Sequence, residues 1–517
     1  MRTTGLALLS PSLSLGLVLL AGNACSEASV APSEIDGILL TEVTVISPER
    51  SEPLTDAWVE VRNGLIEAIG QGEPPRSTAD LPRKEGGDRY LLPGLIDSHV
   101  HLESIPGMAF PQQQANPKLV KAYRRQLPRS YLFHGFTSLI DLAPGNPEVL
   151  ETIRRSPVAP DIFSCSNPLV LANGYPMAFL PPRLRFRLYP NFLYDPRQAD
   201  AIPEKFRPED HSPAAGVKRV ADAGGICVKT FVEDGFGVQK TWPVPTVEML
   251  SAIKTAARQH QIPMTVHANS FDAYALALDG GADVLVHGLW TWDRHQEADR
   301  APGSDLPEPL QDLAQRVITS GTAVMPTLQV LAGDRALFDS TFLADPRLLQ
   351  VLPTELVSWY SSEEGGWFAQ NLLEGLPPDQ QTPQAAYDGH TEALSRGERV
   401  ATYLAHHGGR ILFGSDTPSG PSYGNPPGYN GFLEMRRLAA TGLPLDRLLA
   451  AATLENARAF GLEDRFGSIA KGKVANLLLL EKNPLETVEA YDTIAGVILH
   501  GQWLDRESLT ANRLEEP

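Results

Sequence analysis

Short apolar runs alternate with segments of helical periodicity between about residues 90 and 460. The helical segments include 246–259 and 445–460, and this alternation predicts repeated βα units around a parallel sheet. Eight runs match the eight strands of a (β/α)8 barrel, so we expect the α/β class and a TIM-type barrel. The runs are 95–101, 136–142, 161–166, 226–232, 264–268, 284–288, 323–328 and 410–416.

Alternating apolar and polar positions on both sides of this region predict strands instead. Residues 38–72 alternate around Asn63-Gly64, and residues 494–503 do so around His500-Gly501, which indicates two hairpins. A further apolar run, 477–480, precedes the second hairpin. We therefore predict one small composite β domain built from residues 35–90 and 461–517, beside a barrel over residues 91–460.

The first 25 residues form a segment of a different kind. Arg2 precedes an apolar run over residues 6–21, which is the pattern of a secretory signal peptide and is too short to span a membrane. Cys25 follows residues that resemble the processing site of bacterial lipoproteins, and ordinary cleavage near Ala24 or Ala28 is the alternative. We expect export, either to the bacterial periplasm or to a membrane surface through a lipidated Cys25.

Charge and cysteine content narrow the partners and the compartment. A formal net charge of −18 argues against binding to nucleic acid or to an anionic membrane surface, and it says little about the substrate. A single sequence specifies no oligomeric state. Cys165 and Cys227 lie in apolar runs, where buried free thiols are the default expectation and a disulfide is the alternative in an oxidising compartment.

Residues that bind metal ions end several of the predicted strands. His99 and His101 are two positions apart on the first strand and so face the same side, while Asp416 ends the eighth strand, next to the first in a closed barrel. His267 and His287 end the fifth and sixth strands, which are neighbours. We predict one cation held by the first three residues and a second held by His267 and His287. Such mixed sites suit catalytic zinc, iron or nickel.

Lys229 lies within the apolar fourth strand, which would bury its amine. Burial disfavours the ammonium form and lowers the pKa, so the amine becomes a neutral nucleophile that can capture carbon dioxide as a carbamate. A carbamate could bridge two cations. The alternative, which the strand pattern alone favours, is a lysine paired with Glu233 or Asp234.

The chain resembles the amidohydrolase superfamily at both ends of the predicted barrel. Residues 92–102 are similar to the opening strand of that superfamily, and residues 453–480 are similar to its closing segment. The resemblance is strongest to the imidazolonepropionase-like and prolidase-like branch, whose members assemble a β-sandwich from both chain ends. The closing motifs are Asn456-Ala457, Gly461-Leu462, Gly467-Ser468-Ile469 and Gly472-Lys473.

The resemblance implies a site with two divalent metal ions, for which zinc is the first choice. His99, His101 and Asp416 would hold one ion, His267 and His287 the other, and Lys229 would be the carboxylated bridging ligand. Imidazolonepropionase itself uses one metal and lacks this lysine, so that particular activity is not the one expected. The chain also departs from the closing segment, because residues 474–476 read Val-Ala-Asn where an acidic residue is usual.

The predicted activity is hydrolysis of an amide C–N bond in a dipeptide, an N-acyl amino acid or a cyclic amide. Two metals would generate a bridging hydroxide and polarise the carbonyl, and Asp416 would act as general base and pass the proton to the leaving amine. Alternatives are a deaminase, an esterase or lactonase, and a non-catalytic metal-binding protein. Residues 268–270 read Ala-Asn-Ser after His267, without the glutamate usual in deaminases.

Substrate contacts are expected just after the strand ends. Asn173, Tyr175, Trp290 and Tyr423 are the candidates, and loop packing is the alternative for each. Residues 104–130 and 331–395 form longer segments after the first and seventh strands, where lid or pocket roles compete with simple structural insertion. No cluster of arginines at these positions indicates a free substrate carboxylate.

Overall fold

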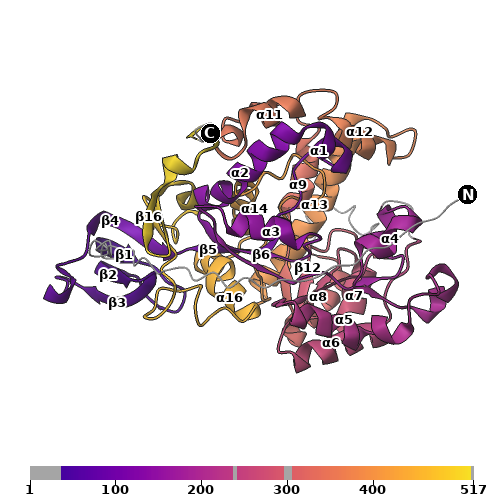
Figure 1. The fold of residues 1–517 in the computed structure, drawn as a ribbon, viewed down its shortest axis with the longest axis horizontal. Coiled ribbons are helices and arrows are strands. Elements are labelled where there is room, and N and C mark those ends of the chain that lie inside the picture. Colours follow the sequence, from indigo (N-terminus) through magenta and orange to yellow (C-terminus); the bar gives the residue numbers. More distant parts are fainter. Residues whose placement is uncertain (1–36, 237–240, 296–305, 514–517) are drawn as a thin grey trace, which may run out of the picture.

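A computed structural model describes residues 37–236, 241–295 and 306–513. One seven-stranded sheet lies beside a larger region of short parallel strands covered by helices (Figure 1). The predicted signal segment and Cys25 lie outside the described residues. Within the described ranges, no helix has the length and apolar character needed to cross a membrane.

The parallel strands form two sheets, with the orders β5–β6–β7 and β10–β11–β12–β13. β5 is buried along its whole length, as expected for parallel strands covered on both faces. A pair of two-residue strands, β8 and β9, follows the first sheet. The bounds are β5 (Leu95–Val100), β6 (Phe136–Asp141), β7 (Asp161–Ser164), β8 (Val170–Leu171), β9 (Phe192–Leu193), β10 (Val228–Phe231), β11 (Met264–His267), β12 (Val284–Val286) and β13 (Ala323–Met325).

Isolated contacts, rather than continuous ladders, connect these two sheets. On one side Leu169 bridges Thr230, and on the other the predicted eighth strand bridges β13 through Ile411 and β5 through Thr417. The closed eight-stranded barrel is therefore not found among the described residues, although the arrangement is of the TIM-barrel type. Ser166 and Asp416 have φ values of 59° and 52°, so left-handed residues interrupt the extended backbone at both junctions.

Most of the helices around the parallel strands bury apolar residues at helical spacing. In α6, the Thr246 hydroxyl accepts a hydrogen bond from the Met249 amide at the N-terminus, and Leu250, Ile253 and Ala257 are buried. The bounds of the helices around the strands are α3 (Pro147–Arg154), α4 (Pro182–Leu188), α5 (Pro213–Asp222), α6 (Val247–Gln259), α7 (Phe271–Asp279), α8 (Glu308–Ser320), α14 (Tyr429–Ala440), α15 (Leu445–Ala450) and α16 (Asn456–Ala459).

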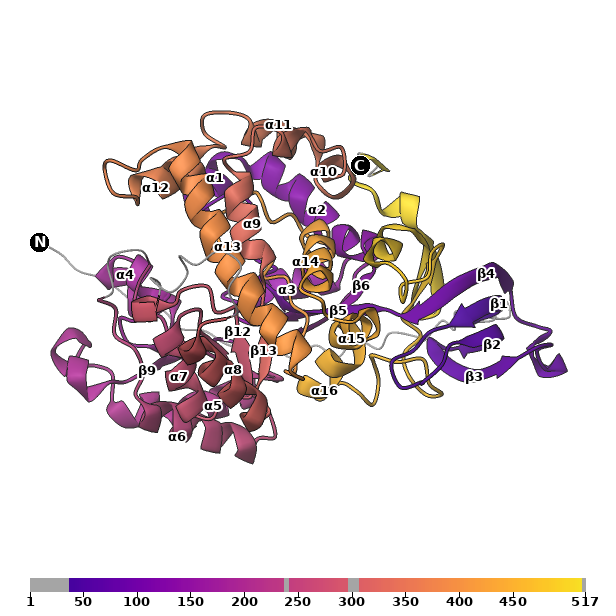
Figure 2. The same cartoon turned by 180° about the vertical axis from the view of Figure 1, so that it is seen from behind.

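The two long segments after the first and seventh predicted strands are largely helical. α9 and α13 pack side by side and run past β12 and β13 (Figure 2). α11 and α12 lie with α1 and α2 along one side of the molecule (Figure 1). The bounds are α1 (Phe110–Ala115), α2 (Pro117–Phe133), α9 (Gln329–Ala336), α10 (Leu348–Val351), α11 (Thr354–Tyr360), α12 (Trp367–Glu374) and α13 (Pro383–His406).

Strands from both ends of the chain meet in one mixed sheet of order β16–β15–β14–β4–β1–β2–β3. The predicted β-sandwich is not confirmed, because these strands form a single sheet. Both hairpins are confirmed: Asn63 and Gly64, and His500 and Gly501, all have the positive φ that tight hairpin turns require. The bounds are β1 (Gly37–Val45), β2 (Leu54–Arg62), β3 (Leu65–Gln71), β4 (Arg83–Pro93), β14 (Leu477–Leu480), β15 (Ile494–Leu499) and β16 (Gln502–Asp505).

The expectation of two free thiols is wrong. Cys165, just after β7, and Cys227, just before β10, form a disulfide across one junction between the parallel sheets. Both are fully buried in an apolar cluster that also contains Ile96, Val286 and Met325. Pairing depends on which strands become neighbours in space, and the 62-residue separation along the chain gave no indication of it.

Candidate metal centre

Six predicted ligand residues converge at the C-terminal ends of the parallel strands. His99 lies in β5 and Lys229 in β10, His267 ends β11, and His287 directly follows β12. These four, together with His101 and Asp416, line one cavity of about 680 Å³. Convergence of side chains from separate strands at this end of the sheet is typical of active sites in this architecture.

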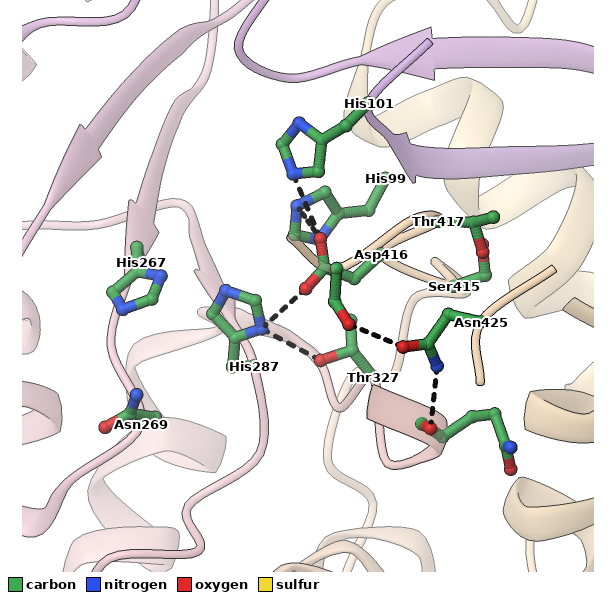
Figure 3. A network of polar contacts seen from close by, with 12 residues as sticks. His99, His101, His267, Asn269, His287, Thr327, Ser415, Asp416, Thr417 and Asn425 are labelled. Atoms are coloured by element: carbon green, nitrogen blue, oxygen red, sulfur yellow. Dashed lines mark hydrogen bonds and ion pairs between the residues drawn. The ribbon is translucent and has the colours of Figure 1, made fainter. Parts of the chain in front are cut away.

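Asp416 lies at the centre of the imidazoles (Figure 3). Its Oδ1 lies 3.1 Å from His99 Nε2 and 3.0 Å from His101 Nε2, and its Oδ2 lies 3.8 Å from His287 Nδ1. Donor atoms of His99, His287 and Asp416 all lie within 4.8 Å of one another, a spacing that could hold a metal ion. This triad draws on both predicted sites, and His101 lies beside it, on the same Asp416 oxygen as His99.

His267 and His287 are neighbours, as predicted, with ring centroids 4.5 Å apart. The polar partner of His267 is Glu233, whose Oε2 lies 3.3 Å from His267 Nε2 and accepts a hydrogen bond of 2.9 Å from Asn269. His287 Nδ1 lies 2.9 Å from the Thr327 hydroxyl (Figure 3). Such outer contacts fix the orientation of imidazole ligands. No sequence pattern indicated Thr327, and Glu233 was considered only as a partner of Lys229.

Lys229 is 1% exposed, and its Nζ has no hydrogen-bond partner among the described residues. Pairing with Glu233 or Asp234, the alternative expected from the strand pattern, is therefore not found. Burial lowers the pKa of Lys229 to about 7, so a large fraction of the amine is neutral near neutral pH. Burial also depresses the pKa of His99 and His287 well below the usual value, which keeps both imidazoles in the neutral form that binds metals.

Further residues hold the eighth predicted strand against β5. The Asp97 carboxylate accepts hydrogen bonds from the amides of Ser415 and His99, at 2.9 and 3.2 Å. Burial raises the pKa of Asp97 to about 7, although the bonds from Ser415 oppose the shift. Asn456 donates to the carbonyls of both segments, those of Ile96 and Phe413. The opening and closing motifs contain Asp97 and Asn456, but the sequence alone assigned a role to neither.

Close packing and backbone strain occur where the eighth predicted strand meets β5. A Cβ atom on Gly414 would come within 2.8 Å of His99 Cβ and still nearer to Met325, so only glycine permits this packing. His287, Thr327 and Asp416 have φ values of 88°, 45° and 52°. Left-handed conformations are costly for these residue types and occur preferentially at functional sites.

The family model described as "Amidohydrolase family" matches residues 90–290 and 388–504, more than half of the chain and including all six candidate ligands. The chain belongs to the amidohydrolase family. This confirms the family predicted from the opening and closing motifs. Among curated protein sequences, none matches the chain significantly.

Solved structures of other amidohydrolases share the fold. A Xaa-Pro dipeptidase with methionine in its active site is 19% identical, with a TM-score of 0.59 over 91% of this chain and 100% of that one. Ochratoxinase from A. niger is 17% identical, with a TM-score of 0.62 over 91% and 96%. Molinate hydrolase is 16% identical, with a TM-score of 0.59 over 92% and 96%. The prolidase-like structure among them is consistent with the predicted branch.

Of the predicted substrate contacts, the structure brings two to the amidohydrolase cavity. Tyr175 and Trp290 line it, with ring centroids 4.8 Å from that of His267 and 5.6 Å from that of His287, respectively. Asn173 is not among the lining residues and bonds to Arg185. Tyr423 is also absent from the lining and stacks on the Tyr360 ring at 5.1 Å.

Helices of the segment 331–395 complete the cavity. α9 contributes Leu331 and Asp334, α12 contributes Phe368 and Leu372, and α13 contributes His390. This segment therefore has the pocket role that the sequence left as one of two interpretations. The individual residues were not predictable, because their positions depend on how α9, α12 and α13 pack over the strand ends.

Proposed function

We propose that this amidohydrolase uses divalent metal ions to cleave an amide C–N bond in a small molecule. The observation that carries the proposal is the buried, unpartnered amine of Lys229 in a cavity with four histidines and Asp416. A buried polar atom without a partner is destabilising unless a ligand, an ion or a modification completes it. A structural lysine would have a partner.

The residues present fit metal ions by their donor chemistry. Neutral imidazoles and a carboxylate suit zinc, and besides Lys229 Nζ the buried His99 Nδ1 has no hydrogen-bond partner in the described ranges. We propose two ions, with His99, His101 and Asp416 holding one and His267 and His287 the other. When bound, such ions lower the pKa of water and polarise a carbonyl oxygen.

Lys229 is proposed to complete the ligand set as a carbamate. Its neutral amine adds to carbon dioxide and loses one proton, which leaves a carboxylate on a long side chain. Glu233 does not compete for the Lys229 amine, because its carboxylate already contacts His267, Asn269 and the Gly235 amide. The modified side chain would carry negative charge where the unmodified amine has no hydrogen-bond partner.

Asp416 is proposed to move the proton. A carboxylate oxygen accepts the proton of the attacking water and then donates it to the leaving nitrogen, which must be protonated before the C–N bond breaks. Contacts with His99 and His101 orient this carboxylate in the cavity. Trp290 and residues of α9 and α12 line the same space.

The proposed substrate is a dipeptide, an N-acyl amino acid or a cyclic amide. In support, the names of the structural neighbours include a Xaa-Pro dipeptidase, an ochratoxinase and a molinate hydrolase. Ester or lactone hydrolysis would use the same groups. Deamination is the second candidate because Glu233 supplies a carboxylate 3.3 Å from His267 even though no glutamate follows that histidine in the sequence.

We also propose that the protein is exported. The support is the signal-like segment 1–25, and lipidation of Cys25 would attach the mature chain to a membrane. Radiolabelled palmitate incorporation, compared with a Cys25→Ser variant, tests the lipid anchor.

The test of the metal proposal combines elemental analysis with a Lys229→Ala variant of the chain without its first 25 residues. We expect about two metal ions per wild-type chain and a marked loss in the variant. Lys218→Ala is the matched control, since Lys218 lies exposed on α5 and pairs with Asp222. A ¹³C-carbamate resonance after labelling with ¹³C-bicarbonate should disappear only in Lys229→Ala. One ion per chain, unaffected by the loss of Lys229, would contradict the two-metal proposal.

A further inference from the structure

The cavity has two unlike walls, and this contrast bears on the substrate. Rings from the loops after β8 and β10 form one wall, and helices α9, α12 and α13 form the other. Given the proposed amide hydrolysis, on which this inference rests, the two walls determine which amide the site accepts.

The loop wall is aromatic and extends into solvent. Phe179 and Phe236 are 62% and 49% exposed, and their rings stack at a centroid distance of 6.1 Å. Tyr175 continues the wall inward, with its ring 5.5 Å from that of Phe236 and 4.8 Å from that of His267. Large exposed rings beside a cavity indicate a surface that an apolar or aromatic group covers.

The helical wall carries one carboxylate in apolar surroundings. Asp334 lies in α9 and lines the cavity together with Leu331, Phe368 and Leu372. Its Oδ1 is shielded from solvent and has no hydrogen-bond partner among the described residues. His390 is near enough to oppose the rise in the pKa of Asp334 that burial causes, yet no ion pair joins the two side chains in the described ranges. Ser422 also hydrogen-bonds this carboxylate and opposes the same rise in pKa, so one oxygen, Oδ1, is available to a ligand.

The charges around the cavity favour a cation at this wall. Among the described lining residues, Lys229 is the only lysine or arginine, whereas Glu103, Asp334 and Asp416 supply carboxylates. A free carboxylate on the substrate would meet no guanidinium here. An ammonium group would be attracted to Asp334, where apolar neighbours lower the local dielectric, whereas the proposed metal ions add positive charge at the strand ends and would repel it there.

We propose that Asp334 binds a protonated amine of the substrate, so that the enzyme prefers amides with an apolar or aromatic group on one side of the scissile bond and an ammonium group on the other. Glu103 is the competing carboxylate. It is less suited, because the guanidinium of Arg124 lies beside it, bonded to the carbonyls of Leu102 and Glu103.

Binding of small probes to the metal-loaded enzyme tests the amine site without turnover. Isothermal titration would compare 2-phenylethylamine with the uncharged 2-phenylethanol and the anionic phenylacetate. We expect the amine to bind at least about ten-fold more tightly than the alcohol, as a charge-assisted bond would give. Asp334→Asn should abolish this difference, and thermal unfolding would confirm that the variant is folded.

Two variants make the assignment specific. Glu392→Gln removes a carboxylate from the exposed face of α13 and should retain the preference for the amine. Glu103→Gln should also retain it. Equal binding of amine and alcohol by the wild type, persistence of the preference in Asp334→Asn, or its loss in Glu103→Gln would each overturn the proposal.

Turnover measurements distinguish a failure of this inference from a failure of the proposed function. Glycyl, β-alanyl and 4-aminobutyryl 2-naphthylamides would be compared with their uncharged acyl isosteres. We expect kcat/KM to favour the amines by about ten-fold or more at the best chain length, and to do so only while Asp334 is present. Cleavage of the uncharged amides at an equal rate would refute the amine site and leave amide hydrolysis standing. If none of these amides is cleaved while amine binding is intact, the hydrolysis of these amides is refuted and the amine site stands.

Discussion

The ionisable groups compared at the two ends of the parallel strands differ in how completely they are paired. At the C-terminal ends, Lys229 Nζ and His99 Nδ1 are buried without hydrogen-bond partners among the described residues. At the N-terminal end of β7, Asp161 Oδ2 accepts a 2.7 Å hydrogen bond from Asn476 and lies 3.1 Å from His500 Nε2. Asn476 also accepts a hydrogen bond from the His500 amide, so this end is a paired network.

This difference in pairing distinguishes the strand ends that serve function from the strand ends that serve stability. An unpaired buried polar group costs about 1–3 kcal/mol, so the C-terminal ends are destabilising until a ligand completes them. The N-terminal ends join the parallel strands to the seven-stranded sheet, where Gly94 donates to the Asn476 carbonyl and Gly135 packs against Leu478. We therefore expect changes at the first end to affect activity and changes at the second end to affect folding.

Asp416→Asn should have the largest effect on activity, and it tests the difference between the two ends of the strands most directly. The amide neither accepts the proton of the attacking water nor binds a cation as a carboxylate does, so we expect kcat/KM to fall by about 10³-fold or more. The unfolding midpoint should change little. The measurements are steady-state kinetics on a cleaved amide and thermal unfolding of both proteins.

Asp161→Asn at the opposite end of the strands is the matched control for that variant. It also replaces a carboxylate by an amide, but in contact with Asn476 and His500. It should lower the unfolding midpoint while kcat/KM stays near the wild-type value. Equal losses of activity in the two variants would show that the two ends are not functionally separate.

The sequence predicts the C-terminal ends better than the rest of the molecule. The side chain of a histidine or aspartate at the end of an apolar run points to a predictable side of the strand, whichever strand lies next to it. The alternation of side chains along the strand sets that direction. His99, His101, His267, His287 and Asp416 therefore reached one cavity as predicted. Their division between two cations was not fixed in this way, since it depends on distances of a few ångströms between strands.

Contacts between segments distant in the sequence were not predictable. Asp334 and His390 reach the cavity only through the packing of α9 and α13, and the partner of Cys165 depends on the junction between two sheets. Asn476 is instructive, because the resemblance marked residues 474–476 only as a departure from the closing segment. Here it donates to the Asp161 carboxylate, which a second carboxylate at that position would repel.

The disulfide Cys165–Cys227 lies between the two ends, in the apolar interior below Lys229. A Cys165→Ala/Cys227→Ala variant should lose about 3 kcal/mol of unfolding free energy, because the unfolded chain is no longer closed into a loop of about 60 residues. Urea denaturation would measure the shift in midpoint. Metal content at temperatures well below unfolding should stay unchanged, and its loss would show that the disulfide also positions Lys229.

The smallest expected effect lies at the paired end and depends on pH. The bond with Asp161 raises the pKa of His500, against a smaller opposing effect of burial. A raised pKa in the folded state means that the stabilisation is present below the unfolded value of about 6.5 and is lost as pH rises through the folded pKa. Because the imidazole is half-exposed, the contribution should stay below about 1 kcal/mol.

His500→Asn isolates this contribution, since asparagine tolerates the left-handed backbone of the turn. Urea denaturation of wild type and variant at pH 6 and pH 8 would give the difference in unfolding free energy at each pH. We expect that difference to shrink at pH 8, and Asp161→Asn to abolish the same pH dependence. A difference that is independent of pH would mean that the turn is stabilised by its backbone bonds to Asn476 and not by the charge pair, and the two strand ends would then differ in hydrogen bonding alone.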